Sequence, residues 1–244
     1  MHSARARLAL LPALAALIGV GAVGCGGGGA GEQEASGPEA SAPAYDGPMV
    51  DPEVAVISVE GMGEMVVELL PGKAPKTVEN FKKLVREGFY DGTTFHRVVP
   101  GFMIQGGDPN TKDRDPRNDG RGGPGYTIPG EFSDVHHKRG VVSMARRGSP
   151  DSGGSQFFII VDDAPHLDGQ YAAFGHVISG IEVADRIVAV PRDKFGRNGP
   201  RDRPLEDVRM TIRLEPGAAP MTDETEGEPG AEPAADTAHD EPTG

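Results

Sequence analysis

The chain has 244 residues, of which 37% are hydrophobic, and it carries a formal net charge of −13 and a single cysteine. This length and hydrophobic content allow one large folded domain or two small ones. A single cysteine cannot form a disulfide within the chain, so a disulfide-stabilised scaffold is excluded.

The first 25 residues have the pattern of a targeting segment. Arg5 and Arg7 precede an apolar run, residues 8–23, that is interrupted by Pro12 and several glycines. At about 16 residues the run is short for a membrane-spanning helix and typical of a signal peptide. We therefore predict that residues 1–25 direct export of the protein.

Cys25 directly follows the small residues Ala22 to Gly24 and resembles the cysteine of a bacterial lipobox. In that class of exported protein the cysteine becomes the first residue of the mature chain and carries lipid. The resemblance implies a cell-envelope protein that is anchored to a membrane through Cys25 and faces the periplasm or the exterior. Ordinary cleavage after Gly24, which leaves a soluble secreted protein, is the alternative.

Two polar segments flank the central part of the chain. Residues 26–52 are mainly Gly, Ala, Ser, Pro and Glu, and we expect a disordered linker there. Residues 215–244 contain nine acidic residues and no Lys or Arg, which predicts a disordered acidic tail. The tail carries −9 and residues 1–52 carry −3, so that −1 remains for residues 53–214. This near-neutral part has no basic stripe, which argues against a nucleic-acid partner.

Residues 53–214 have the length of a single domain, and their local patterns are mainly those of strands. Two β-branched runs, 53–60 and 64–70, flank a glycine-containing loop and predict a hairpin. Further strands are expected at 140–145, 155–161, 172–178 and 205–214. Helical periodicity follows Pro75 up to Gly88 and recurs at 180–190. Many short strands with two helices favour an all-β fold, a closed barrel capped by the helices.

One stretch, FHRVVPGFMIQGGD at residues 95–108, places a cation inside an apolar run. A buried guanidinium is costly unless it is paired or has a task in a partly wet cleft. For Arg97 taken alone, a structural ion pair and a functional role are both open.

Four motifs, FHRVVPGFMIQGGD, GVVSMAR, GGSQFFI and LDGQYAAFGHV, occur in the order and spacing of the cyclophilins, and the match runs from about residue 53 to 213. The chain thus resembles a family of peptidyl-prolyl cis-trans isomerases (EC 5.2.1.8). The resemblance implies a closed eight-stranded antiparallel β-barrel capped by two α-helices. It also implies a monomeric enzyme that needs no cofactor and acts on proline-containing polypeptides.

The same resemblance assigns roles to individual residues. Arg97 matches the donor that points at the prolyl nitrogen and favours the twisted amide, and Gln105 matches the residue that supports it. The catalytic set implied by the family is Arg97, Gln105 and Phe102. The substrate-binding positions implied by the family are His96, Met103, Ala145, Arg146, Gln156, Phe158, Leu167 and Tyr171. Among the site residues, Phe102, Met103, Phe158 and Leu167 match the positions that form the apolar pocket for the proline ring, and Ala145 and Gln156 match residues that line the groove.

The chain departs from the best-known eukaryotic relatives at several of these places. His166 stands where those relatives have Trp, and Tyr171 stands where they have His, so the rim of the site lacks a large indole. Arg146 stands where many relatives have Asn, at a position expected to bind peptide through its backbone. The loop at residues 111–125 is unusually charged and lies where it could affect which peptides approach.

One further expectation rests on the residues alone, and another, about function, rests on the family resemblance. The adjacent pair His136 and His137 lacks metal-ligand spacing, so we expect a solvated loop and no metal. The favoured function is an isomerase that assists the folding of exported or envelope proteins. The alternative is a proline-peptide-binding chaperone or scaffold that requires little turnover.

Overall fold

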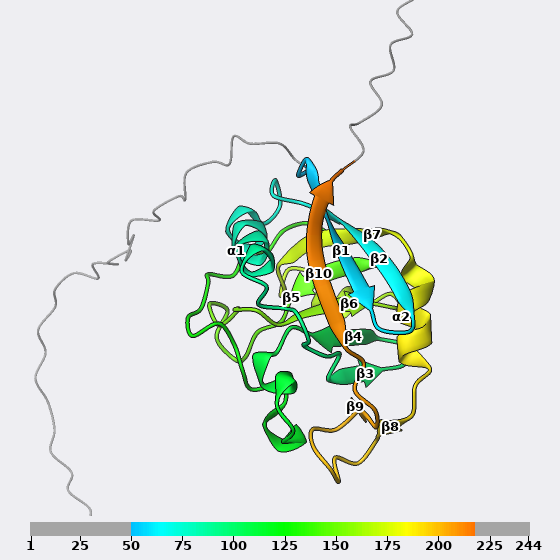
Figure 1. The fold of residues 1–244 in the computed structure, drawn as a ribbon. Coiled ribbons are helices and arrows are strands. Elements are labelled where there is room, and N and C mark those ends of the chain that lie inside the picture. Colours follow the sequence, from blue (N-terminus) through cyan, green and yellow to red (C-terminus); the bar gives the residue numbers. More distant parts are fainter. Residues whose placement is uncertain (1–49, 218–244) are drawn as a thin grey trace, which may run out of the picture. The chain divides into compact units, whose positions relative to one another are not determined.

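An eight-stranded antiparallel sheet curls around the core in the computed structural model, which describes residues 50–217 (Figure 1). The predicted signal peptide, Cys25, the linker up to residue 49 and the tail beyond residue 217 lie outside the described residues. Asp51 is ion-paired with Lys82 at 2.7 Å, and the last strand continues to Pro216. The packed part therefore includes a few residues on either side of 53–214.

The order of strands in the main sheet is β10-β1-β2-β7-β5-β6-β4-β3. A separate two-stranded sheet pairs β8 with β9. The bounds are β1 (Glu53–Val59), β2 (Gly63–Leu69), β3 (Arg97–Val99), β4 (Met103–Gly106), β5 (Val141–Met144), β6 (Phe157–Ile160), β7 (Ala173–Ser179), β8 (Arg192–Asp193), β9 (Arg203–Pro204) and β10 (Met210–Pro216).

The sheet is curled but open, so the prediction of a closed barrel is wrong. Its edge strands, β3 and β10, are not paired with each other. The segment before β3 instead bonds to the chain around the start of β10, with Gly92 N donating to the Met210 carbonyl and Phe95 N to the Val208 carbonyl, both at 3.0 Å. Since β3 has only three residues, this irregular stretch and a single bridge between Thr94 and Arg209 stand where a closing ladder would be.

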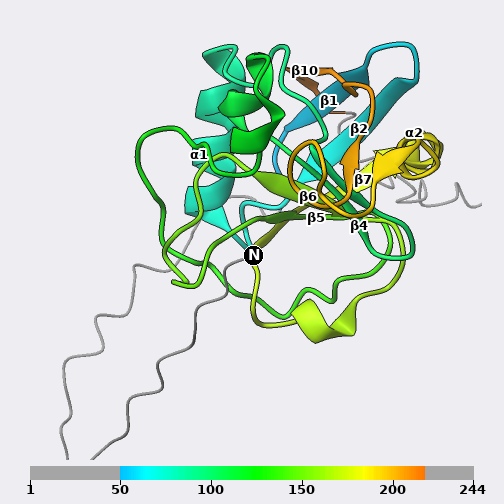
Figure 2. The same cartoon turned by 90° about the horizontal axis from the view of Figure 1, so that it is seen from below.

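Both predicted helices are confirmed. Helix α1 (Pro75–Arg86) begins with proline at its first turn, where the missing N–H costs nothing, and buries Val78, Phe81, Leu84 and Val85. Helix α2 (Ile181–Val188) buries Val183, Ala184 and Ile187. The two helices lie at opposite ends of the curled sheet (Figures 1 and 2), and both pack into the same main core. Neither of them, within residues 50–217, is long and apolar enough to cross a membrane.

Apolar side chains form two separate clusters, because successive residues of a strand point to opposite faces. On β6, Phe157 and Ile159 belong to the main core, whereas Phe158 and Ile160 belong to the other cluster. We call the latter the second apolar cluster. Its buried members are Met103, Val141, Phe158, Ile160, Ala164, Leu167 and Ala173, and its partly buried neighbours are Val99, Phe102, Val135, Ala145 and Tyr171.

Candidate active site

Arg97 and Gln105 are brought together by the pairing of two short strands. They are direct partners in the β3–β4 register, and the Arg97 Nη1 donates to the Gln105 Oε1 at 3.4 Å. The Arg97 side chain is neither fully buried nor fully exposed. Among residues 50–217, no carboxylate lies within ion-pair distance of this guanidinium. A guanidinium has five N–H donors, so most of them remain available to a bound molecule.

A chain of side-chain amides continues from this pair. Gln105 Nε2 donates to Gln156 Oε1 at 2.9 Å, and Gln156 Nε2 donates to the Gly122 carbonyl at 2.9 Å. The orientation of Gln105 is therefore set by its second partner, which turns its Oε1 toward Arg97. Gln105, Ala145, Arg146 and Gln156, all of them predicted site residues, line one cavity of about 380 Å³.

The residues predicted to form an apolar pocket all belong to the second apolar cluster. Three of them, Met103, Phe158 and Leu167, are buried, with 1%, 5% and 7% of their surface exposed, and Phe102 is partly buried in the same cluster. The Phe158 and Tyr171 rings meet edge to face, with centroids 5.4 Å apart. Met103 and Leu167 come from different elements, β4 and the 3₁₀ turn η3 (Pro165–Leu167), and converge beside Phe158.

The rim of this cluster carries the residues that depart from the best-known relatives. The His166 ring lies 5.4 Å from the Phe102 ring, measured between centroids. The Arg146 guanidinium lies over the Tyr171 ring at 4.8 Å, and its Nε donates to the Gln170 carbonyl at 2.8 Å. The ring contact and the hydrogen bond together fix the Arg146 guanidinium over Tyr171.

His96 lies beneath the site and not on its surface. Only 2% of its surface is exposed, and neither ring nitrogen has a hydrogen-bond partner among residues 50–217. Burial lowers the pKa of His96 to about 4, with the nearby Asp108 carboxylate acting in the opposite direction. The imidazole is therefore neutral at pH 7. The structure places this predicted substrate-binding residue among buried side chains, next to Gly120.

The expectation of a solvated loop for the two adjacent histidines is right for His136 and wrong for His137. His136 is exposed, whereas His137 keeps 2% of its surface exposed. The buried ring bridges two side chains, with Ser143 Oγ 2.9 Å from its Nε2 and Asp168 Oδ1 3.0 Å from its Nδ1. Asp168 also accepts from His136 Nδ1 and from the His137 backbone, and these bonds lower the pKa of Asp168.

This polar chain was missed at the level of sequence, where no local signal marks it. It has the residue types of a hydrolase triad, but Ser143 is fully buried and so cannot act as a nucleophile on a substrate. Its position indicates a supporting role, because the His137 ring stacks on Phe158 with centroids 6.3 Å apart and an angle of 21°. The hydrogen bonds among Ser143, His137 and Asp168 therefore support Phe158, which forms one wall of the second apolar cluster.

The charged loop at 111–125 is anchored to the folded part at two points. The buried Asp108 accepts at Oδ1 from Asn110 N and at Oδ2 from Gly122 N, at 2.8 and 3.1 Å. Asp119 accepts from Arg203 Nε at 2.6 Å. Burial raises the pKa of Asp119, against the lowering effect of Arg203. Within the part of the chain that the structure describes, no cluster of His, Cys, Asp and Glu has the arrangement of a metal site.

Comparison with known proteins identifies the family of this chain. Residues 54–214 match the family model for the cyclophilin type peptidyl-prolyl cis-trans isomerase/CLD. A Brucella suis protein named "Probable peptidyl-prolyl cis-trans isomerase" is 44% identical over 170 residues, covering 68% of this chain and 85% of its own. Peptidyl-prolyl cis-trans isomerase B of Bacillus subtilis is 51% identical over 128 residues, covering 52% and 84%.

A solved structure agrees with these sequence matches. A cyclophilin type peptidyl-prolyl cis-trans isomerase of Cryptosporidium parvum, crystallised in the presence of the dipeptide Ala-Pro, superposes with a TM-score of 0.58 at 31% identity. The match covers 66% of this chain and 98% of that one. The chain belongs to the cyclophilin family, and its activity is that of a peptidyl-prolyl cis-trans isomerase.

Proposed function

We propose that Arg97 stabilises the twisted amide during isomerisation of an X-Pro bond. Rotation about this bond meets a barrier of ~18–20 kcal/mol, because resonance gives the bond partial double-bond character. In the twisted state the prolyl nitrogen loses conjugation and becomes a hydrogen-bond acceptor. A guanidinium directed at that nitrogen stabilises the transition state more than the planar ground state, which is what accelerates a reaction.

The observation that carries this proposal is the partner of Arg97. Its one side-chain hydrogen bond among the described residues is to the neutral amide of Gln105, so the structural ion pair considered from the sequence has no support in residues 50–217. Because the Gln105 amide is neutral, the positive charge of Arg97 is not compensated and can act on a bound ligand. Gln105 orients the guanidinium without neutralising it.

The substrate that fits this arrangement is a proline-containing polypeptide. Phe102, Met103, Phe158 and Leu167 offer an apolar wall for the proline ring, and their rigid aromatic rings and adaptable thioether suit that task. Gln105, Ala145, Arg146 and Gln156 line the adjoining cavity and supply polar contacts for the peptide backbone. The Cryptosporidium parvum relative, crystallised with Ala-Pro, supports this class of ligand.

Exchange NMR on a short X-Pro peptide tests this function with the full chain kept soluble by detergent. An isomerase brings cis and trans signals into exchange at catalytic enzyme concentration, whereas the alternative, a chaperone or scaffold, shifts the peptide signals without speeding their exchange. Uncatalysed exchange takes tens to hundreds of seconds, so the two outcomes are well separated.

We also propose that the enzyme is anchored in the cell envelope by lipid on Cys25 and acts there on exported or envelope proteins. This rests on the sequence of residues 1–25, where a short apolar run ends at the sole cysteine. The protein should partition into detergent and carry N-terminal lipid, and Cys25→Ser should release it into the aqueous phase. A mature protein whose N-terminus is unmodified, at Cys25 or beyond it, would show instead that it is secreted in soluble form.

We further propose that the protein acts as a monomer. A site assembled wholly from residues of one chain, such as the β3–β4 pair and the second apolar cluster, needs no second copy. Light scattering on the detergent-free Cys25→Ser protein measures its mass directly, and a dimer at working concentration would contradict this part.

A further inference from the structure

A cavity of about 380 Å³ adjoins the catalytic pair at Gln105 and the second apolar cluster at Ala145. It shares Gln105 and Gln156 with the amide chain that orients Arg97. The rest of its lining comes from two loops, with residues 120 and 122–127 in one and residues 145–147, 152, 154 and 155 in the other. A peptide whose proline lies on the second apolar cluster can therefore place a neighbouring side chain in this cavity.

The side chains that line this cavity carry positive charge and no negative charge. It includes Arg146 and Arg147 but no Asp or Glu. The backbone of a third arginine, Arg121, adjoins them, because Arg147 Nη2 donates to the Arg121 carbonyl at 2.6 Å. The basic character is local, since residues 53–214 together carry only −1.

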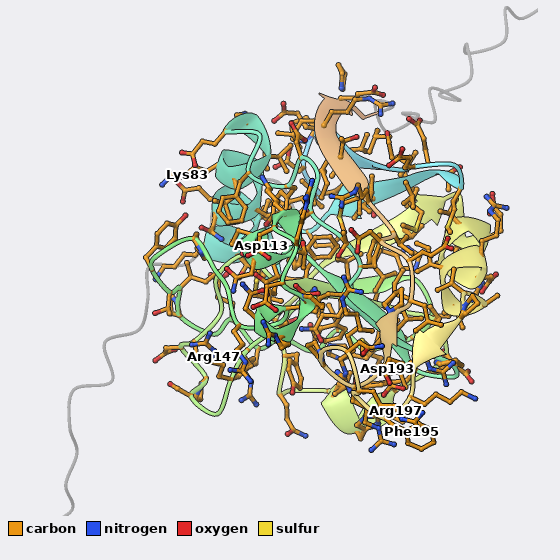
Figure 3. All side chains as sticks on the ribbon, turned by 60° about the horizontal axis from the view of Figure 1, so that its bottom comes forward. Lys83, Asp113, Arg147, Asp193, Phe195 and Arg197 are labelled. Atoms are coloured by element: carbon orange, nitrogen blue, oxygen red, sulfur yellow. The ribbon has the colours of Figure 1, made fainter. Side chains whose placement is uncertain are left out.

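Neither arginine that lines the cavity is ion-paired, although just over half of the arginines in residues 50–217 are. Eight of the fifteen arginines in residues 50–217 have a carboxylate within 4.0 Å, namely Arg86, Arg117, Arg139, Arg192, Arg201, Arg203, Arg209 and Arg213. Arg121, Arg146 and Arg147 are not among them. Figure 3 shows Arg147 on the opposite side of the view from Arg197, another arginine without such a partner.

Both cavity arginines are held in place by neutral groups. Arg146 packs over the rings of Tyr171 and Phe132, at 4.8 and 5.7 Å, and donates to the Gln170 and Arg147 carbonyls. Arg147 is fixed by the Arg121 carbonyl. Positioned guanidinium groups with unused donors match a carboxylate, to which they form short charge-assisted hydrogen bonds.

We propose that this cavity selects peptides with an acidic side chain, Asp or Glu, a few residues from the isomerised proline, and that Arg147 determines the selection. The proposal rests on the isomerase function proposed above and names the substrate class that this site prefers. Long-range charge does not produce such a preference, because the whole chain carries −13 and repels an acidic peptide.

The test is a set of peptides that differ at one position. A neutral Ala-rich peptide with a single X-Pro bond carries Glu, Gln or Lys in turn at each of three positions on either side of the proline. Exchange NMR with the full chain gives kcat/KM for each peptide. At one position, Glu should exceed Gln by about two- to fivefold, the range of a partly exposed ion pair, and Lys should fall below Gln. The excess should shrink at high salt.

Two variants locate the effect. Arg147→Gln should bring the Glu-to-Gln ratio close to one. Arg186→Gln is the matched control, because Arg186 is also exposed, has no carboxylate partner among the described residues, and donates to a backbone carbonyl, that of Met62. This control should keep the wild-type ratio.

Equal rates for Glu and Gln at every position would overturn the proposal, as would a ratio that Arg147→Gln leaves unchanged or that Arg186→Gln lowers equally. Failure of the isomerase function itself looks different, because no peptide of the set, including those with Gln, would then be turned over. The Gln peptides thus separate the two claims within one experiment.

Discussion

Phe157 and Phe158 are neighbours on β6 and face opposite sides of the sheet, Phe157 in the main core and Phe158 in the second apolar cluster. Both are buried, with 0% and 5% of their surface exposed. The same substitution at two adjacent positions can therefore separate stability from substrate binding.

Phe158→Leu should weaken peptide binding and lower kcat/KM by about tenfold, because it opens the wall against which the proline ring packs. Phe157→Leu should destabilise the protein by about 1–2 kcal/mol and leave kcat/KM of the folded enzyme nearly unchanged. Denaturant unfolding and exchange NMR on both variants measure the two effects. The assignment of the second apolar cluster to substrate fails if both variants lose kcat/KM equally.

The buried hydrogen bonds that join Ser143, His137 and Asp168 predict that removing the Ser143 hydroxyl destabilises the fold. Ser143→Ala leaves a buried imidazole nitrogen without its partner, which should lower the free energy of unfolding by about 1–3 kcal/mol. Ser58→Ala is the control, because that hydroxyl bonds Glu64 in an exposed network on β1, and its loss should stay within about 0.5 kcal/mol. If urea unfolding shows that both variants lose the same free energy of unfolding, the buried hydrogen bonds of His137 do not have the stabilising role proposed for them.

The buried, unpartnered His96 predicts a loss of stability in mild acid. Its folded pKa is about 4, below the ordinary value of 6.5, so between these values the unfolded state binds more protons. Stability from the neutral ring is present above pH 6.5 and is lost as the pH falls toward 4. Between pH 7 and 4.5 this amounts to about 2–3 kcal/mol.

His96→Phe removes this titration while keeping a ring. Asp108, Arg97 and Arg203 are the charged groups that act on the imidazole, and all three remain in the variant. The variant should lose about 2–3 kcal/mol less than the wild type between pH 7 and pH 4.5 in urea unfolding. Identical pH dependence in the two proteins would show that His96 is not the group responsible.

Local patterns in the sequence predicted those parts of the fold that depend on local chemistry. Helix α1 follows from apolar spacing after Pro75, and strand β6 lies within the strand expected at residues 155–161. The motif resemblance placed Phe102, Met103 and Phe158 together, and the structure does bring them into one cluster.

The features that sequence reasoning got wrong depend on distant partners. His137 is buried because Ser143 and Asp168, six and 31 residues away, take both of its ring nitrogens, and nothing in the pair His136–His137 indicates this. Whether the sheet closes depends on how β3 and β10 meet, and an irregular segment of residues 92–95 takes the place of a ladder there. Neither outcome leaves a periodic signal in the chain.

The role of Arg97 is tested most directly by comparing turnover with affinity in Arg97→Ala. Exchange NMR gives the catalytic constant, and chemical-shift titration gives the peptide Kd, for the wild type, Arg97→Ala and Arg97→Lys. If the guanidinium acts mainly in the transition state, Arg97→Ala lowers kcat by about one to three orders of magnitude, or about 1.4–4 kcal/mol, while Kd changes far less. Arg97→Lys recovers little, because an ammonium lacks the planar fork that can bond both Gln105 and the peptide. Full turnover in Arg97→Ala, or equal losses of turnover and affinity, would contradict the account and favour a module that only binds proline-containing peptides.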